Sequence, residues 1–265
     1  HMKDWFRGVL PEINPITCNY TYTVRGGLAK GFRRKGGFGF IPRSNTTEED
    51  FLLQQDLQSK VVFDVGGNSG MYSLFFASKV GDSGTVYTFE PNPLNQKEIH
   101  ENVQLNQFKN ITVFGIGLAA SSGKATLTFN PLGRATGSFN EEIRSNLKRT
   151  QKKICEISVD LDTIDNMVEQ GLVKKPDFIK VDVEGLEMDV LKGAKNTLHD
   201  CEPELFIEVH GANVQHKMSN AKQLLNYLDK YDYSMFHVES SSRIKPSDYQ
   251  TAMIGHIFAS KNQTQ

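Results

Sequence analysis

The sequence predicts an α/β fold built on a mostly parallel sheet. The first observation is an alternation, from residue 61 onward, of short runs rich in β-branched and aromatic residues with longer segments of helical periodicity. The second is a glycine-rich turn, "DVGGNSG" at 64–70, between the first such run and the first helical segment. Strands that alternate with helices form a sheet covered by helices on both faces. The predicted strands are 61–66, 85–91, 111–115, 177–183, 204–210, 233–238 and 254–261.

Helices are predicted between these strands. Residues 69–80 follow the first strand, 92–106 follow the second and 186–198 follow the fourth, each with apolar residues at helical spacing. A further helix is predicted at 220–230. The order of elements therefore supports a doubly wound sheet.

Two regions interrupt the alternation. Residues 8–45 are rich in Gly and Thr, which predicts a hairpin or cap, and "NTTEEDF" then predicts a helix start with Thr46 or Thr47 as its cap. Residues 123–160 hold two more strand-like runs around a polar segment, which we expect to form a mobile loop or helix over the site. The predicted organisation is an N-terminal cap and first helix at 1–55 and a main domain at 56–265, with a lid-like insertion at about 130–155.

Charge and composition exclude several classes of partner. The 30 Lys and Arg residues against 31 Asp and Glu residues give a formal net charge of -1, so no global field favours nucleic acid or an anionic membrane. No apolar run approaches the ~20 residues of a membrane span. The cysteines, Cys18, Cys155 and Cys201, lack the spacing of a disulfide framework or a structural zinc site. We therefore expect a cytoplasmic protein with no nucleic-acid partner and no membrane span.

The glycine-rich turn lies where doubly wound folds bind ligands, at the carboxyl edge of the sheet. Gly66, Gly67 and Gly70 allow positive φ and close backbone approach, and the next helix offers free N–H groups to an anionic part of a ligand. The spacing G-G-x-x-G matches neither the dinucleotide motif nor a phosphate loop. Asp64 before the turn suits a ligand with a cationic amine beside a carboxylate, which describes the amino-acid end of S-adenosylmethionine.

Glu90 ends the second predicted strand, in "YTFEPNP", where a carboxylate can accept hydrogen bonds from both hydroxyls of a ribose. It follows the turn by about 20 residues, as in nucleotide-binding sites of this kind. Taken singly, such a turn is often structural and such a glutamate is often solvated. Together, and in this order, they indicate a nucleoside-type ligand.

Five segments resemble the FkbM-type S-adenosylmethionine-dependent methyltransferases. They are, in order, "VVFDVGGNSGMYSLFFA", "VYTFEPNP", "ITVFGIGLAASSGKATL", "FIKVDVEGLEMDVLKGA" and "ELFIEVH", within residues 40–260. The resemblance implies a class I methyltransferase (Rossmann-like) fold, a doubly wound seven-stranded sheet whose last strand is antiparallel, here preceded by the small N-terminal hairpin and helix cap. It also implies an O-methyltransferase that uses S-adenosylmethionine to modify a hydroxyl of a sugar, glycoside or polyketide-type natural product.

Positions that match the family's motifs imply cofactor contacts. The amino-acid end is expected at Asp64, Gly66, Asn68, Gly70 and Tyr72. Glu90 is expected at the ribose, and Leu118 is expected to form a wall for the adenine. The chain departs from the family at "GLAASSG", where an acid-containing turn is common, so Ala119 and Ala120 offer no polar side chain to the adenine.

The predicted chemistry needs a proton acceptor. Alignment supplies much of the rate of methyl transfer, but a sugar hydroxyl is a poor nucleophile at neutral pH and needs a general base or a divalent cation. His210 is the predicted base, because the intrinsic pKa of histidine suits the task. Asp182 is expected to hold the sulfonium end or a substrate hydroxyl, with Glu184 and Glu208 as supports, and Lys180 is expected beneath them.

Other interpretations remain beside this one. Our expectation is a site without metal, but Asp182, Glu184, Glu208 and His210 could bind Mg²⁺ in a metal-dependent small-molecule O-methyltransferase. The two acids near residue 183 could instead cap a helix, His210 could be a core histidine, and the chain could be a catalytically silent cofactor-binding domain. The absence of a [DN]-P-P-[YF] stretch and the glycine spacing disfavour nucleic-acid methylation and NAD-dependent chemistry.

Substrate recognition is expected from segments outside the core. The runs "RRK" at 33–35 and "RSNLKRTQKK" at 144–153 are strongly basic. Such runs are usually solvated faces, but they could form a lid over a small hydroxylated substrate that is anionic or carrier-linked, such as a nucleotide-linked sugar. The sequence does not identify the acceptor or the oligomeric state.

Overall fold

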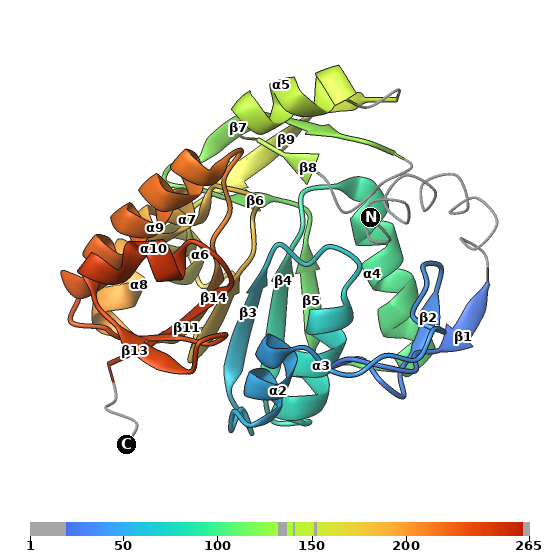
Figure 1. Ribbon diagram of the computed structural model, residues 1–265. Helices are drawn as coiled ribbons and strands as arrows, with labels where there is room; N and C mark the ends of the chain where they lie inside the picture. Colours follow the sequence, from blue (N-terminus) through green and yellow to red (C-terminus); the bar gives the residue numbers. More distant parts are fainter. Residues whose placement is uncertain (1–19, 132–136, 140, 151–152, 262–265) are drawn as a thin grey trace.

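The computed structural model describes residues 20–131, 137–139, 141–150 and 153–261. Among these residues, the central sheet has eight strands (Figure 1). In spatial order they are β13 (Ser242–Ile244), β12 (Ser234–His237), β14 (His256–Ser260), β11 (Glu204–Glu208), β10 (Phe178–Val181), β3 (Val61–Val65), β4 (Thr85–Phe89) and β5 (Ile111–Phe114).

The predicted doubly wound sheet with an antiparallel last strand is confirmed, but it has eight strands where seven were predicted. Strands β11, β10, β3, β4 and β5 pair in parallel, and β14 lies antiparallel between β11 and β12. The difference is one short edge strand, β13, which pairs with β12 and extends the sheet to eight strands. Its sequence, "SRI", is too short and polar to predict a strand.

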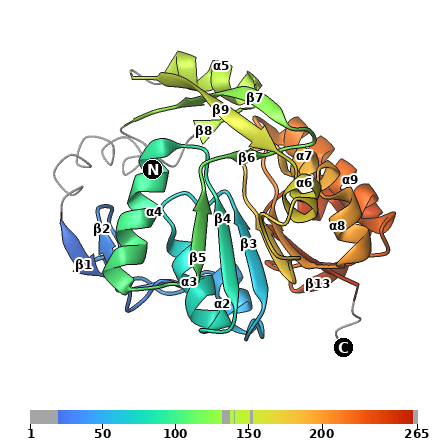
Figure 2. The same cartoon turned by 180° about the vertical axis from the view of Figure 1, so that it is seen from behind.

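Alternate residues of the strands face two separate cores. Val62 packs with Phe75 and Phe76 in one core, and Phe63 and Val65 pack in the other. Helices α3 (Met71–Val80) and α4 (Pro93–Asn106) lie beside β3–β5. Helix α2 (Thr47–Leu53) lies on the same face as α3, where the ring of Phe51 packs against rings of β11, β12 and β14. The opposite face is covered by α6 (Ile164–Glu169), α7 (Glu187–Lys192), α8 (Lys195–Asp200) and α9 (Val214–Asp229) (Figures 1 and 2). The sheet is therefore covered on both faces, as its apolar strands require.

Several helix boundaries differ from the sequence prediction. The helix predicted at 186–198 is two short helices, α7 and α8, which meet at Gly193, where an added Cβ would collide with the carbonyl oxygen of Ala119. Helix α9 begins earlier than predicted because the side chain of Asn213 caps it by accepting the N–H of His216. The short helices α6, η1 (Pro246–Asp248) and α10 (Tyr249–Ala252) were not predicted, since each has too few residues for a periodic pattern.

The N-terminal hairpin and helix cap are present. Strand β1 (Thr21–Thr23) pairs antiparallel with β2 (Arg33–Lys35). Thr46 is the N-cap of α2, and its backbone N–H donates to the carboxylate of Glu49. Residues 1–19 of the predicted cap lie outside the described residues.

A second sheet is inserted between β5 and α6. Its strands are β6 (Gly117–Leu118), β7 (Gly123–Phe129), β8 (Gly137–Ser138) and β9 (Cys155–Asp162), and α5 (Glu141–Thr150) lies on its outer side (Figure 1). Because β6 follows β5 directly, this layer lies over the carboxyl edge of the parallel strands. Both added strands predicted in 123–160 are present, and part of the predicted lid lies outside the described residues.

Within the described part of the chain, none of the helices has the length and apolar character that crossing a membrane requires.

Candidate active site

A cavity lies at the carboxyl edge of the parallel strands, beneath the inserted sheet. Its walls come from the turn after β3, the end of β4, the start of α4, strand β6, the segment after β10 and the inserted layer. The lining includes Gly66, Asn68, Glu90, Asn95, Leu118, Leu127, Phe139, Asp182 and Glu184. The cavity therefore joins the glycine-rich turn to the acids after β10.

Two glycines fix the shape of the turn after β3. Gly66 has a φ of 87°, and a Cβ at this position would collide with the carbonyl oxygen of Asp182. Gly70, with a φ of 81°, is the N-cap of α3, and a Cβ there would lie 3.1 Å from the side chain of Ile99. Left-handed backbone and close packing both require glycine here. The turn can therefore lie directly against the end of β10.

Glu90 is buried at the end of β4, with 6% of its surface exposed. Its Oε2 accepts the N–H of Asn68 at 2.7 Å and its Oε1 accepts the N–H of Asn92 at 2.8 Å. Burial raises the pKa of Glu90 to about 7, although these N–H groups favour the charged form. Nearby, the buried Oδ1 of Asn95 has no hydrogen-bond partner among the described residues. This end of the cavity offers acceptors to a ligand with O–H or N–H donors.

Lys180 lies beneath the site, between two carboxylates. Its Nζ lies 3.3 Å from Asp64 Oδ1 and 3.3 Å from Asp182 Oδ2, and its side chain is 4% exposed. Burial lowers its pKa, but Asp182 and Asp64 outweigh burial and raise it, so the lysine stays charged. Asp64 also accepts the hydroxyl of Ser73 at 2.6 Å. Asp64 is thus enclosed, while Asp182 reaches the cavity.

His210 follows β11 and lies among carboxylates. Its Nδ1 lies 2.9 Å from Glu187 Oε1, and its Nε2 lies 3.4 Å from Glu208 Oε1 and 3.8 Å from Asp182 Oδ1. Desolvation lowers the pKa of the imidazole, but the contacts with Glu187 and Glu208 and the charge of Asp182 outweigh it and raise the pKa to about 11. Without cofactor, the ring therefore carries two protons at neutral pH.

Glu208 connects His210 to a second histidine, His256 at the start of β14. Glu208 Oε2 lies 3.6 Å from His256 Nε2. Burial raises the pKa of Glu208, but the two imidazoles outweigh burial and hold it well below its usual range. The carboxylate is therefore ionised throughout the neutral range. Burial raises the pKa of Glu184, and the nearby carboxylates of Asp182, Glu208 and Glu187 raise it further, against the opposing charge of His210.

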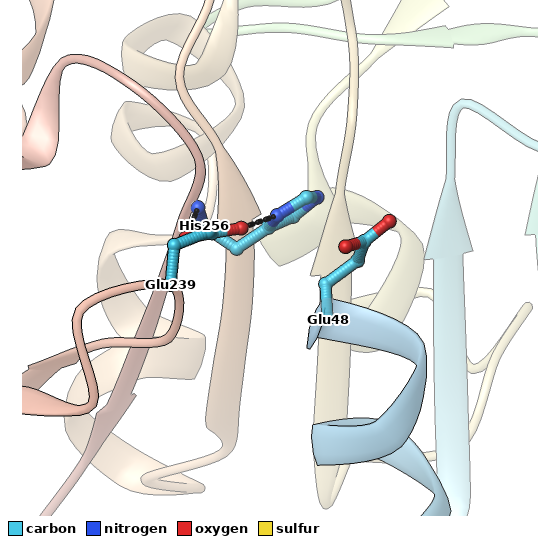
Figure 3. Close-up of side chains that lie close together, drawn as sticks. All are labelled: Glu48, Glu239 and His256. Carbon is cyan, nitrogen blue, oxygen red and sulfur yellow. Dashed lines mark hydrogen bonds and ion pairs between the residues drawn. The ribbon is translucent and has the colours of Figure 1, made fainter. Parts of the chain in front are cut away.

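His256 has a carboxylate partner of its own. Its Nδ1 lies 2.6 Å from Glu239 Oε1, and Glu48 of α2 points toward the same ring (Figure 3). Burial lowers the pKa of His256, but Glu208 and Glu239 raise it to about 9. Ligand atoms of Glu48, Glu239 and His256 lie within 4.8 Å of one another, as do those of Asp182, Glu208 and His210. Either group has the donor atoms that a divalent cation uses.

The structure brings most of the predicted site residues together. The cavity lining includes Gly66, Asn68, Glu90, Leu118, Asp182 and Glu184. Glu208 and His210 adjoin this lining through Asp182. The remaining three predicted residues support the turn rather than line the cavity: Asp64 is enclosed, Gly70 caps α3, and the ring of Tyr72 lies 4.7 Å from Lys180 Nζ. The roles assigned to all of these residues stay predictions.

Sequence reasoning missed four residues of this region. Glu187 and Asn95 lie in the first turns of α7 and α4, where polar residues are usually taken as helix caps. His256 and Glu239 lie in the last quarter of the chain, outside any motif. The signal that could have found Asn95 is its place in "EPNPLN", five residues after Glu90.

Four side chains of the two basic runs form ion pairs within the protein. Arg34 lies 3.0 Å from Glu98, and Lys35 lies 3.2 Å from Glu101. In the inserted layer, Arg144 and Lys148 both contact Glu156. Because these four side chains have acidic partners within the protein, the basic character of the two runs does not by itself indicate an anionic ligand.

A sequence model of the methyltransferase FkbM domain matches residues 64–235. The chain belongs to the FkbM methyltransferase family. The match covers the glycine-rich turn, Glu90, the acids after β10 and His210, so the predicted family resemblance is confirmed.

Curated relatives include methyltransferases of archaeal, fungal and bacterial origin. The hexuronic acid methyltransferase AglP of Haloferax volcanii is 33% identical over 161 residues, 60% of this chain and 59% of that protein. Methyltransferase 1 of Beauveria bassiana is 27% identical over 56% of this chain and 64% of its own length. The 2-O-methyltransferase NoeI of Sinorhizobium fredii is 22% identical over 52% and 58%. The aligned region thus spans about three fifths of these relatives.

Among solved structures, the methyltransferase FkbM of Methylobacillus flagellatus superposes with a TM-score of 0.52 at 19% identity, covering 80% of this chain and 46% of that one. At this level of identity, the likeness supports the class I fold.

Proposed function

We propose that this chain is an S-adenosylmethionine-dependent O-methyltransferase that acts on a hydroxyl of a sugar, glycoside or polyketide-type natural product. One observation carries the proposal: a single cavity joins Glu90 and the glycine-rich turn to Asp182, which contacts His210. Glu90 and the glycine-rich turn suit a nucleoside with an amino-acid tail. Asp182 and His210 suit a hydroxyl that must lose a proton.

The residues fit an adenosyl ligand. The carboxylate of Glu90 accepts two backbone N–H groups and a hydrogen bond from the side chain of Asn95. Its remaining acceptor capacity and the unpartnered Oδ1 of Asn95 can accept ribose hydroxyls. Leu118 offers an apolar wall. The volume of the cavity, about 80 Å³, is below the ~300 Å³ of typical ligand pockets. We infer that the covering layer, which contributes Leu127 and Phe139, moves outward when the cofactor enters.

S-adenosylmethionine supplies an activated methyl group, and the chain supplies alignment and a proton acceptor. Asp182 is held by Lys180 and faces the cavity, where its charge suits a cationic sulfonium. His210 Nε2 lies on the same side and receives the proton that the acceptor hydroxyl loses as its oxygen forms the new bond to carbon. Because the pKa of His210 is raised to about 11 by its carboxylate neighbours, we expect the methylation rate to increase with pH through the alkaline range.

The proposed acceptor is a sugar hydroxyl, a choice supported by the names of two relatives, a hexuronic acid methyltransferase and a 2-O-methyltransferase. The acidic groups around His210 and the internal pairing of the basic segments favour a neutral acceptor over an anionic one. A panel of neutral, amino and uronic acid glycosides, assayed with S-adenosylmethionine for the mass of one added methyl group, tests both the reaction and this preference.

The cofactor is tested by calorimetric titration with S-adenosylhomocysteine, repeated with EDTA, with Mg²⁺ and with NAD in its place. We expect micromolar binding of the adenosyl ligand that is indifferent to metal, and none of NAD. Binding that required Mg²⁺ would instead support the metal-dependent alternative, which is favoured by the convergence of Asp182, Glu208 and His210 within 4.8 Å. Absence of binding would contradict the proposed cofactor.

A further inference from the structure

His210 is held at two points, one on its backbone and one on its imidazole. The side chain of Asn220 donates to the backbone carbonyl of His210 at 2.8 Å, and Nδ1 lies 2.9 Å from Glu187 Oε1. The side chain of Glu187 is 4% exposed, and the same oxygen accepts the N–H of Gly185 at 3.0 Å. A carboxylate has no proton to give, so Nδ1 is the donor in its contact with Glu187.

The turn between β10 and α7 brings Glu187 to this place. Glu184 and Gly185 have φ values of 51° and 95°, in the left-handed region, which reverses the chain directly after β10. Glu187 then opens α7 with its side chain directed back toward the turn. A non-glycine residue in left-handed backbone is costly, so the surrounding contacts must stabilise it.

Because Nδ1 is engaged, the other nitrogen has a fixed direction. Nε2 points toward Asp182 and Glu208 at 3.8 and 3.4 Å, on the side of the cavity. A rotated or mobile ring would not keep Nε2 within reach of an acceptor hydroxyl.

We propose that Glu187 is a positioning residue that holds the imidazole of His210 through Nδ1, so that Nε2 faces the acceptor hydroxyl. This rests on the proposed function, since it presumes that His210 receives the acceptor's proton. As the hydroxyl oxygen forms its bond to the methyl carbon, the bond from that carbon to the sulfonium sulfur breaks and S-adenosylhomocysteine is the leaving group. The O–H bond breaks at the same time, and the proton passes to an Nε2 that has lost its own proton. Glu187 takes up no proton and stabilises the resulting imidazolium.

Carboxylates face His210 from three elements. Asp182 comes from the end of β10 and Glu208 from β11. Glu184 lies in the turn after β10, and Glu187 lies at the start of α7. His256 is connected to His210 only through Glu208. Of Asp182, Glu187 and Glu208, only Glu187 contacts Nδ1, and the other two lie near Nε2. Replacing Glu187 by glutamine therefore removes one negative charge while an amide oxygen can still accept from Nδ1.

The pair His256–Glu239 provides a matched control. It has the same kind of contact, Nδ1 to carboxylate at 2.6 Å (Figure 3). Its carboxylate is 30% exposed, and its partner is His256 rather than His210. Glu239→Gln should leave the contact at Nδ1 of His210, and its Nδ1 proton, in place.

The first test uses nuclear magnetic resonance on histidine-labelled protein saturated with S-adenosylhomocysteine. The chain has seven histidines, and His210→Gln assigns the signal of interest. We expect a downfield, slowly exchanging Nδ1 proton for His210 in the wild type, its loss in Glu187→Ala, and a lower pKa of His210 in Glu187→Gln. A His210 signal that is unchanged in both variants would overturn the proposal.

The second test is kinetic, with a glycoside methylated by the wild type. Glu187→Ala should lower kcat by about tenfold or more with little change in KM for S-adenosylmethionine. Glu187→Gln, which is isosteric and should fold, should shift the pH midpoint of kcat toward acid, a change that a purely structural role would not cause. If both variants kept the wild-type kcat and pH midpoint, the role of Glu187 would be overturned and the proposed function would stand. Failure of the wild type to bind S-adenosylhomocysteine would instead overturn the proposed function and this role with it.

Discussion

The two halves of the candidate active site place carboxylates in opposite electrostatic settings. Glu90, in the adenosyl half, is buried with neutral N–H donors, and burial raises its pKa to about 7. Glu208, in the acceptor half, lies between His210 and His256, which hold its pKa well below its usual range. The adenosyl half is therefore suited to forming hydrogen bonds with neutral hydroxyls, whereas the acceptor half contains paired charges that can exchange a proton.

The two halves also respond to pH in opposite senses. The pKa of Glu90 is raised above its unfolded value, so the stability that its protonated form contributes is present at low pH and lost as pH rises through about 7. The lowered pKa of Glu208 gives a contribution that is present above its unfolded pKa and lost as pH falls. Four variants separate the halves, from the largest expected effect to the smallest.

His210→Ala should abolish most turnover without affecting the adenosyl half. Loss of a general base costs typically about 10²- to 10⁴-fold in rate. We expect kcat to fall by this order while the Kd of S-adenosylhomocysteine changes by less than about twofold. Steady-state kinetics and calorimetry measure the two quantities, and intact turnover would show that His210 is not the base.

Glu90→Ala should produce the reverse pattern. Two ribose hydroxyls would lose their acceptor, at a cost of about 1.5–3 kcal/mol, or roughly 10- to 100-fold in Kd. Calorimetry with S-adenosylhomocysteine measures the loss. If the affinity were unchanged, the ribose assignment of Glu90 would be wrong, and the comparison between the halves would rest on the acceptor side alone.

His256→Gln should destabilise the fold in a pH-dependent way. The folded pKa of about 9 lies above the unfolded value of ~6.5, so the stability of the pairs with Glu208 and Glu239 is fully present below pH ~6.5 and is lost as pH rises through about 9. We expect a loss of about 1–2 kcal/mol at pH 6.5. Thermal unfolding at pH 6.5, 8 and 10 measures it, and a difference from wild type that does not shrink at pH 10 contradicts the pairing.

Phe139→Ala should have the smallest effect, on the rate of cofactor entry. Phe139 and Leu127 cover the cavity from the inserted layer. If this layer must move outward, a smaller side chain should raise the association rate of S-adenosylhomocysteine by a few-fold, on the order of 1 kcal/mol in the barrier. Stopped-flow fluorescence measures it, with Leu172→Ala, an exposed residue away from the lining, as control. Equal rates in all three proteins would argue against the proposed opening.

The sheet and the adenosyl half could be predicted from sequence because their signals are local. Seven apolar runs predicted seven of the eight strands of the central sheet. The turn at Gly66 is specified by residues within one short stretch. The prediction of a single helix at 186–198 was wrong, because the break at Gly193 depends on Ala119, more than 70 residues away in sequence. The edge strand β13 has no signal of its own and forms only because β12 offers it a partner.

The sequence by itself therefore determined the class of fold, the family and the position of the glycine-rich turn and Glu90, since periodicity and short motifs encode them. Only the tertiary structure decided that Asp64 is enclosed by Lys180 and Ser73, that Glu187 holds His210, and that His256 contacts Glu208. Each of these contacts joins different elements, and long-range packing sets the burial and charge around each group. A carboxylate in the sequence has a fixed identity, but its pKa and its partner are properties of the fold.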